Sequence, residues 1–133
     1  MKKGFTLIEL LVVIGIISIL VVIMIFYFKS TKDKARDALI KETMGTPLTK
    51  LSIEYYVNGN TKSYAAFCND IATEDLLSKI NSPIKYCSDN AEKWAACAQL
   101  NSSSDKAWCA DSTGVRKEIN MATKCKQSIK SCP

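Results

Sequence analysis

A single acidic residue, Glu9, lies in an apolar run of 24 residues that extends from Phe5 to Phe28. Placing a charged side chain at the centre of a membrane-spanning helix costs roughly 2.5 to 3.5 kcal/mol on insertion scales. A cation that enters the membrane together with the acid offsets this cost, so the sequence predicts an ion-pairing role for Glu9. Gly4 stands just before the run.

The apolar run is long enough to cross a bilayer, because about 20 helical residues span the roughly 30 Å hydrocarbon core. A cleaved secretory signal would have a shorter apolar region that ends at small residues, and no such site follows Phe28. A simple signal anchor would hold Glu9 near one end of the helix, where its carboxylate reaches the headgroups. The length of the apolar run and the position of Glu9 are therefore also compatible with a simple signal anchor.

The string Lys3-Gly4-Phe5-Thr6-Leu7-Ile8-Glu9-Leu10 resembles the prepilin leader and cleavage motif of type IV pilins and pseudopilins. The shared features are a short basic leader that ends in glycine, a phenylalanine after it, and a glutamate as the fifth residue of the mature chain. The resemblance implies that a prepilin peptidase cleaves between Gly4 and Phe5 and methylates the new amino group of Phe5. It also implies that Glu9 pairs with the Phe5 amine of the neighbouring subunit in a filament.

The resemblance further implies two successive locations for the chain. The precursor is a single-pass protein of the inner membrane, and the processed subunit then joins an extracellular pilus on the cell surface, as a helical homopolymer or a mixed filament. An all-round apolar helix suits both lipid and burial against copies of itself. Extraction from the membrane is uphill, so we expect an assembly ATPase and an inner-membrane platform protein as partners, and no cofactor. Pilins often carry a proline within this segment, whereas here Gly15 is the only weak breaker.

Six cysteines follow the apolar run: Cys68, Cys87, Cys97, Cys109, Cys125 and Cys132. An even number of cysteines in a small domain, without any C-x-x-C pair, predicts disulfides in an oxidising compartment. Positive charges flank the run on both sides, so the cysteines decide its orientation and place the C-terminal part outside the cytoplasm. Of the 15 pairings that six cysteines allow, we favour Cys125 with Cys132, because this pair closes a short loop.

The sequence divides into four regions: a cleaved leader (1–4), a membrane and filament-core helix (5–28), an amphipathic continuation of that helix (29–58), and a globular head (59–133). Apolar residues of the third region recur at helical spacing, namely Ala35, Leu39, Ile40, Met44, Leu48, Leu51 and Tyr55. Gly45 and Pro47 predict a kink or break. Asn58-Gly59-Asn60 predicts a helix stop of the left-handed type.

The head has about 70 residues, near the lower limit for a self-sustaining core, so disulfides and burial against the helix both matter. We expect a short helix over 73–79, with Thr73 and Glu74 at its start, and short strands at 84–87, 94–100 and 106–109. A helix over 91–100 is the alternative on propensity. The segment 108–114, followed by Lys117 and Glu118, resembles the last strand and turn of small pilin-like proteins. The expected fold is α+β and type IV pilin-like, a long N-terminal helix on a small antiparallel sheet.

Enzymatic chemistry has little support, because the absence of histidine removes histidine-activated nucleophiles and histidine-containing zinc sites. Asp89, Asp105 and Asp111 fall in predicted turns and could bind Ca2+, although turn formation is the commoner role of such residues. No metal site is predicted.

The net positive charge of the chain is modest once the leader is removed. The precursor has 18 basic and 13 acidic residues, and losing Lys2 and Lys3 leaves 16 basic residues and a net charge of +3. Five cations concentrate near the C-terminus with one acid, Glu118, among them: Arg116, Lys117, Lys124, Lys126 and Lys130. A solvated surface is the commoner explanation, and contact with nucleic acid is the weaker one.

Three functions fit these features. The leading one is a structural subunit of a type IV pilus that serves adhesion, motility or DNA uptake. The second is a pseudopilin of a type II secretion or competence system, which has the same N-terminal chemistry. The third is a monomeric anchored protein, which would need neither Gly4 nor Glu9 in particular.

Overall fold

The computed structural model describes residues 4–59 and 62–133, which form two compact units, Met1–Lys32 and Asp33–Pro133. The helices are α1 (Leu7–Thr43), α2 (Thr46–Asn58), the 3-10 helix η1 (Phe67–Asn69), α3 (Ile71–Ser78) and α4 (Met121–Lys124). The strands are β1 (Lys85–Asp89), β2 (Trp94–Gln99), β3 (Lys106–Asp111) and β4 (Arg116–Asn120).

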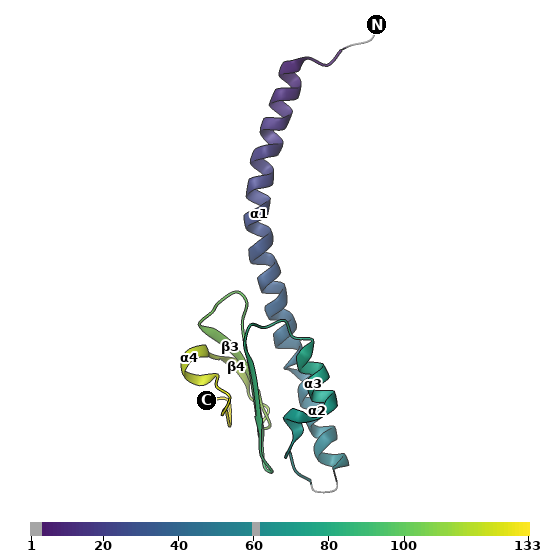
Figure 1. The fold of residues 1–133 in the computed structure, drawn as a ribbon, viewed down its shortest axis with the longest axis vertical. Helices are drawn as coiled ribbons and strands as arrows, with labels where there is room; N and C mark the ends of the chain where they lie inside the picture. Colours follow the sequence, from purple (N-terminus) through teal and green to yellow (C-terminus); the bar gives the residue numbers. More distant parts are fainter. Residues whose placement is uncertain (1–3, 60–61) are drawn as a thin grey trace. The chain divides into compact units, whose positions relative to one another are not determined.

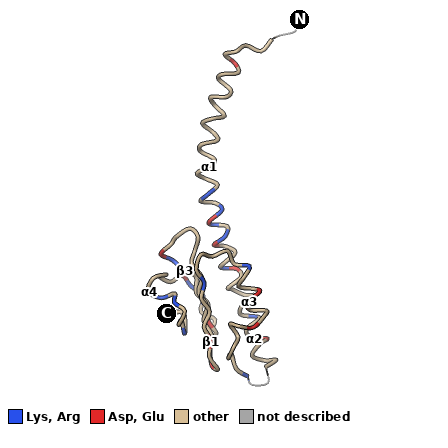
Figure 2. The backbone as a smooth tube through the Cα atoms, in the orientation of Figure 1, with Lys and Arg blue, Asp and Glu red and all other residues tan. Residues whose placement is uncertain are grey.

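The first unit contains the N-terminal part of α1. All large apolar side chains from Phe5 to Phe28 are at least 45% exposed in the isolated chain. Figure 2 shows this stretch without charge except for one acid near its start, which the sequence identifies as Glu9. Among the described residues, this helix is the one stretch that is long and apolar enough to cross a membrane. Its surface therefore needs lipid or other copies of the helix to cover it.

The second unit begins within α1, and the break predicted from Gly45 and Pro47 is confirmed between α1 and α2. A Cβ atom at Gly45 would lie 2.9 Å from the carbonyl oxygen of Lys41, so the turn requires glycine. Pro47 follows in the first turn of α2, where its missing N–H breaks no helical hydrogen bond. The helix ends at Asn58, but Gly59 is extended (φ −70°) rather than left-handed as predicted, and Asn60 lies outside the described residues.

The four strands form an antiparallel sheet in the order β1-β2-β3-β4, which confirms the α+β, pilin-like fold (Figure 1). The three predicted strands are confirmed, and the alternative helix over 91–100 is wrong because β2 lies inside the sheet, with all its residues buried. The segment resembling a last strand forms β3, and the actual last strand is β4. Only Ile119 of β4 is buried, so its sequence carries little apolar signal.

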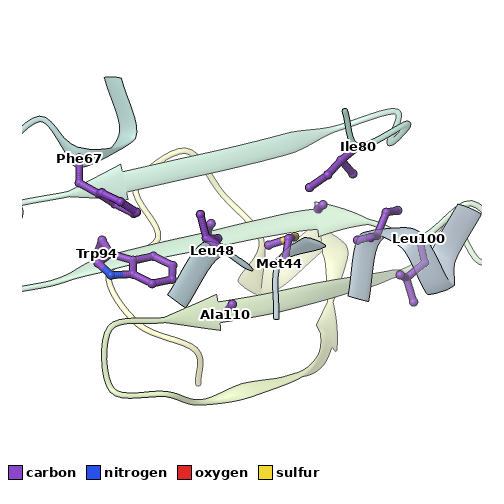
Figure 3. Packing of buried hydrophobic residues seen from close by; sticks show 10 residues of the cluster. Met44, Leu48, Phe67, Ile80, Trp94, Leu100 and Ala110 are labelled. Atoms are coloured by element: carbon purple, nitrogen blue, oxygen red, sulfur yellow. The ribbon is translucent and has the colours of Figure 1, made fainter. Parts of the chain in front are cut away.

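Each face of the sheet is covered by a different part of the chain (Figure 1). On one face, Ile40 of α1, Met44 of the turn after it and Leu48 of α2 pack with Phe67 against alternate β2 residues, which include Trp94 (Figure 3). On the other face, the C-terminal segment covers a second apolar cluster. Its buried members are Ala95, Cys97, Ala107, Cys109, Ile119, Met121, Cys125, Ile129 and Cys132. This alternation follows from the period of two along a strand.

Three disulfides link Cys68 to Cys87, Cys97 to Cys125, and Cys109 to Cys132, so the predicted Cys125–Cys132 pair is wrong. Cys97 and Cys109 are directly paired across β2 and β3 and face the same side of the sheet. The C-terminal segment runs over that side, so each strand cysteine meets a different cysteine of the segment. Sheet pairing, rather than closeness in sequence, decides the connectivity.

Helix α3 starts two residues before the predicted Thr73. Asp70 is its N-cap and accepts a hydrogen bond from the backbone N–H of Ala72 at 3.1 Å. Thr73 is instead buried inside the first turn. Aspartate is a stronger N-cap residue than threonine, so Asp70 rather than Thr73 caps the helix.

Candidate processing and assembly site

The polar residues at the start of α1 form a reciprocal hydrogen-bonded cap. Thr6 precedes the first helical residue, and its backbone N–H and hydroxyl donate to Oε2 of Glu9 at 2.9 and 2.8 Å. The backbone N–H of Glu9 donates in return to Oγ1 of Thr6 at 3.3 Å. This arrangement is a capping box, which satisfies backbone donors that the first helical turn would otherwise leave without partners. The carboxylate also lies in the first turn, where the helix dipole favours negative charge.

The capping box leaves Glu9 able to bind a cation. Only Oε2 accepts the bonds from Thr6, and among residues 4–59 and 62–133 nothing donates to Oε1. A carboxylate offers about four lone-pair sites on its two oxygens, so the remaining oxygen suits an ammonium group. The arrangement therefore holds the acid in place with neutral donors while keeping acceptor capacity for a charged partner.

Gly4 and Phe5 precede α1 in an irregular, exposed stretch, and the side chain of Phe5 is 76% exposed. A Cβ atom built at Gly4 would meet nothing within 4 Å in the described part of the chain. Folding of this chain thus gives no reason for glycine at position 4. Lys2 and Lys3 of the leader lie outside the described residues.

Thr6 is the functional residue that the sequence reasoning missed. The signal was readable, because Thr6 and Glu9 have the T-x-x-E spacing of a capping box just before a helical run.

The three aspartates that could have bound Ca2+ do not form a common site, and each carboxylate accepts hydrogen bonds from protein groups. Asp89 accepts from the backbone N–H groups of Ala66 and Cys68, and Asp105 accepts from the hydroxyl of Ser103. Asp111 organises the β3–β4 turn and accepts from the backbone N–H of Cys132 at 2.8 Å. In the described ranges no three acidic or cysteine side chains gather into a metal-binding group.

The five C-terminal cations lie on β4 and the segment after it, and all five are exposed. Arg116 and Lys117 are in β4, Lys124 ends α4, and Lys126 and Lys130 follow it. Glu118 lies among them and forms ion pairs with Lys41 at 2.6 Å and Lys106 at 3.6 Å. The structure thus places Arg116 and Lys117 in the edge strand β4, and the three lysines in α4 and the chain that follows it.

Residues 1–25 match the family model of the prokaryotic N-terminal methylation motif. This motif is the prepilin leader of type IV pilins and pseudopilins, so the resemblance noted in the sequence is confirmed. Together with the apolar helix, it supports a structural subunit that is a type IV pilin or a pseudopilin. Neither a curated protein nor a solved structure matches the chain.

Proposed function

We propose that this chain is a structural subunit of a type IV pilus. The observation that carries the proposal is the N-terminal site, in which an exposed Gly4–Phe5 segment precedes a capped acid on a helix whose large apolar side chains are exposed up to Phe28. Each part has a use in a processed, polymerising subunit. A simple anchor would use only the apolar surface.

Processing comes first. Prepilin peptidase cleaves after Gly4 and methylates the amine of Phe5. The mature chain then has a filament-core helix (5–28), an amphipathic continuation (29–58) and a globular head (59–133).

Assembly follows through Glu9. The Phe5 amine of a neighbouring subunit approaches the free oxygen of the carboxylate and forms an ion pair inside the apolar core. A subunit that arrives in another register would leave the buried carboxylate without its cation, which is costly, so the pair fixes the register of one helix against the next. The capping box keeps Glu9 oriented before the partner arrives.

The subunit begins as a single-pass precursor in the inner membrane. A platform protein and an assembly ATPase supply the work of extraction, and the polymer extends to the cell surface. Adhesion, motility and DNA uptake are the activities that such a filament serves.

A pseudopilin of a type II secretion or competence system is the second candidate, because its N-terminal chemistry is the same. Three disulfides in a head of this size favour the pilus, since cross-links help a domain to survive harsh surroundings outside the cell.

Shearing intact cells and analysing the released material by N-terminal peptide mass spectrometry separates these functions. A pilus subunit gives abundant peptide that begins at methylated Phe5 in the released fraction. Protein that begins at Phe5 but stays in the membrane fraction would indicate a pseudopilin, and protein that begins at Met1 would indicate a simple anchor.

A further inference from the structure

A hollow of about 620 Å3 lies where α1 meets α2, beside β3 and β4. We call it the basic hollow, because its lining contains Lys41, Lys50 and Arg116 with Glu42 as its one acid, together with the apolar surface of Pro47 and Trp108. A water molecule takes roughly 30 Å3 of liquid volume, so the hollow has room for a side chain. It combines positive charge with an apolar floor.

Arg116 differs from Lys41 and Lys50, the other two cations of the basic hollow, because both lysines already pair with a carboxylate. Lys41 already donates to Glu118 at 2.6 Å, which lowers the pKa of that carboxyl, and lies 5.1 Å from the ring centroid of Trp108. The guanidinium of Arg116 donates to the hydroxyl of Thr49 at 3.0 Å. It pairs with no carboxylate in the part of the chain that the structure describes.

A second patch lies on α3, and we call it the acidic knob: Ile71, Glu74 and Asp75. The i, i+3 and i+4 spacing puts these side chains on one face of α3, and all three line a groove that β1 and β2 border. Ile71 is 85% exposed, more than any other large apolar side chain in the described structure, including those of the membrane helix. Asp75 pairs with Lys79 at 2.7 Å, whereas Glu74 forms no ion pair within the described residues.

We propose that the acidic knob of one subunit docks into the basic hollow of a second copy of this chain. Ile71 fills the apolar part of the hollow, and Glu74 pairs with Arg116. The hollow borders β3 and β4 and the knob borders β1 and β2, so the two patches have no residue in common. A contact between two different patches adds subunits head to tail and builds an open helical polymer if the rotation does not close.

This inference rests on the proposed function, because only a polymer brings many copies of the head together. A second copy explains both patches, since it covers Ile71 and supplies the carboxylate that Arg116 lacks. A nucleic-acid backbone would satisfy Arg116 but would leave Ile71 in water. The charges of the knob can be seen on α3 in Figure 2.

A photo-crosslink in living cells tests the contact. The full chain carries Ile71→p-benzoylphenylalanine, the cells are irradiated, and the cross-linked peptides are identified by mass spectrometry. We expect a dimer-sized adduct whose partner peptide contains residues 41–50 or 108–116. A reversed charge puts like charges together, so Arg116→Glu or Glu74→Arg alone lowers the adduct about tenfold, and the two together restore it.

Lys117→Glu is the matched control, because it makes the same change of charge on the neighbouring residue, which pairs with Cys109 on the opposite face of the sheet. It leaves the adduct unchanged. An absent adduct, a partner peptide from elsewhere, or a double variant that fails to restore the adduct overturns the proposal. It is also overturned if Arg116→Glu lowers DNA retention by the cells while wild type gives no adduct.

The outcome is independent of whether the polymer is a surface pilus. An adduct in the membrane fraction without released filaments would refute the pilus and keep the contact. Released filaments without the adduct would refute the contact and keep the pilus.

Discussion

Replacing Asp37 by alanine removes a buried polar contact between α1 and the β2–β3 loop. The carboxylate is 6% exposed. It accepts from the backbone N–H groups of Asn101 and Ser102 at 2.5 and 3.0 Å, from the Asn101 amide at 3.4 Å, and from the Ser102 hydroxyl. These bonds attach the β2–β3 loop to α1 within residues 33–133.

The size of the effect follows from these four bonds. A hydrogen bond to a charged group contributes about 1.5 to 3 kcal/mol. Asn101 is half-buried and Ser102 is exposed, so water replaces part of what their donors lose in the variant. We therefore expect the free energy of unfolding to fall by about 2 to 4 kcal/mol rather than by the full sum. For a unit of this size, this lowers Tm by roughly 10 to 25 °C.

The contribution of Asp37 also depends on pH. Burial raises the pKa of this carboxyl, but the hydrogen bonds from Ser102 and Asn101 more than offset it, so the pKa lies below its ordinary value. A carboxyl with a lower pKa in the folded state stabilises the fold above its unfolded pKa of about 3.9, and this stability is lost as pH falls through the folded pKa. The difference between wild type and Asp37→Ala should be full at pH 7 and shrink below about pH 4.

The assay is thermal unfolding of the full chain in detergent with its disulfides intact, followed by near-ultraviolet circular dichroism of Trp94 and Trp108. Asp33→Ala is the matched control, because Asp33 lies one turn earlier and makes only a surface pair with Arg36 at 3.6 Å. Such a pair contributes about 0 to 1 kcal/mol. The reasoning is refuted if both variants lower Tm equally, or if the deficit of Asp37→Ala does not shrink at all between pH 5 and pH 2.

Three further predictions follow from the other sites. Gly4→Trp leaves a full-length precursor on immunoblots, because a bulky side chain keeps the peptidase from the backbone; cleavage at the normal rate would contradict the role of Gly4. Gly45→Ala lowers the free energy of unfolding by about 1 to 3 kcal/mol, since its Cβ meets the backbone of the preceding turn, and an unchanged Tm would argue against that turn. Joint replacement of Cys109 and Cys132 by alanine costs about 2 to 5 kcal/mol and leaves the other two bridges in a non-reducing peptide map; a map that joins Cys125 to Cys132 in wild type would contradict the fold.

Local signals account for what the sequence predicted well. The long apolar run, the break at Gly45 and Pro47, and three of the four strands each follow from composition or spacing over a few residues. The capping box of Thr6 and Glu9 is equally local, because it depends on two residues three positions apart, although it was not predicted. The N-cap of α3, Asp70, is also a local signal, because its side chain bonds to the backbone only two residues away.

Long-range pairing accounts for what the sequence did not predict. Asp37 meets Asn101 across 64 residues, and nothing near Asp37 in the sequence distinguishes it from a surface acid. The disulfides of Cys97 and Cys109 depend on which strands are neighbours, so a preference for short loops chose the wrong pair. Strand β4 has one buried residue, Ile119, and is a strand because β3 pairs with it.

The most direct test of the account compares wild type with Glu9→Ala in sheared-cell material, with N-terminal masses measured in both the released and the membrane fractions. The account predicts that both proteins begin at methylated Phe5, that wild type is abundant in the released filaments, and that Glu9→Ala stays in the membrane. Normal amounts of Glu9→Ala in released filaments would contradict the pairing of Glu9 with the neighbouring Phe5 amine.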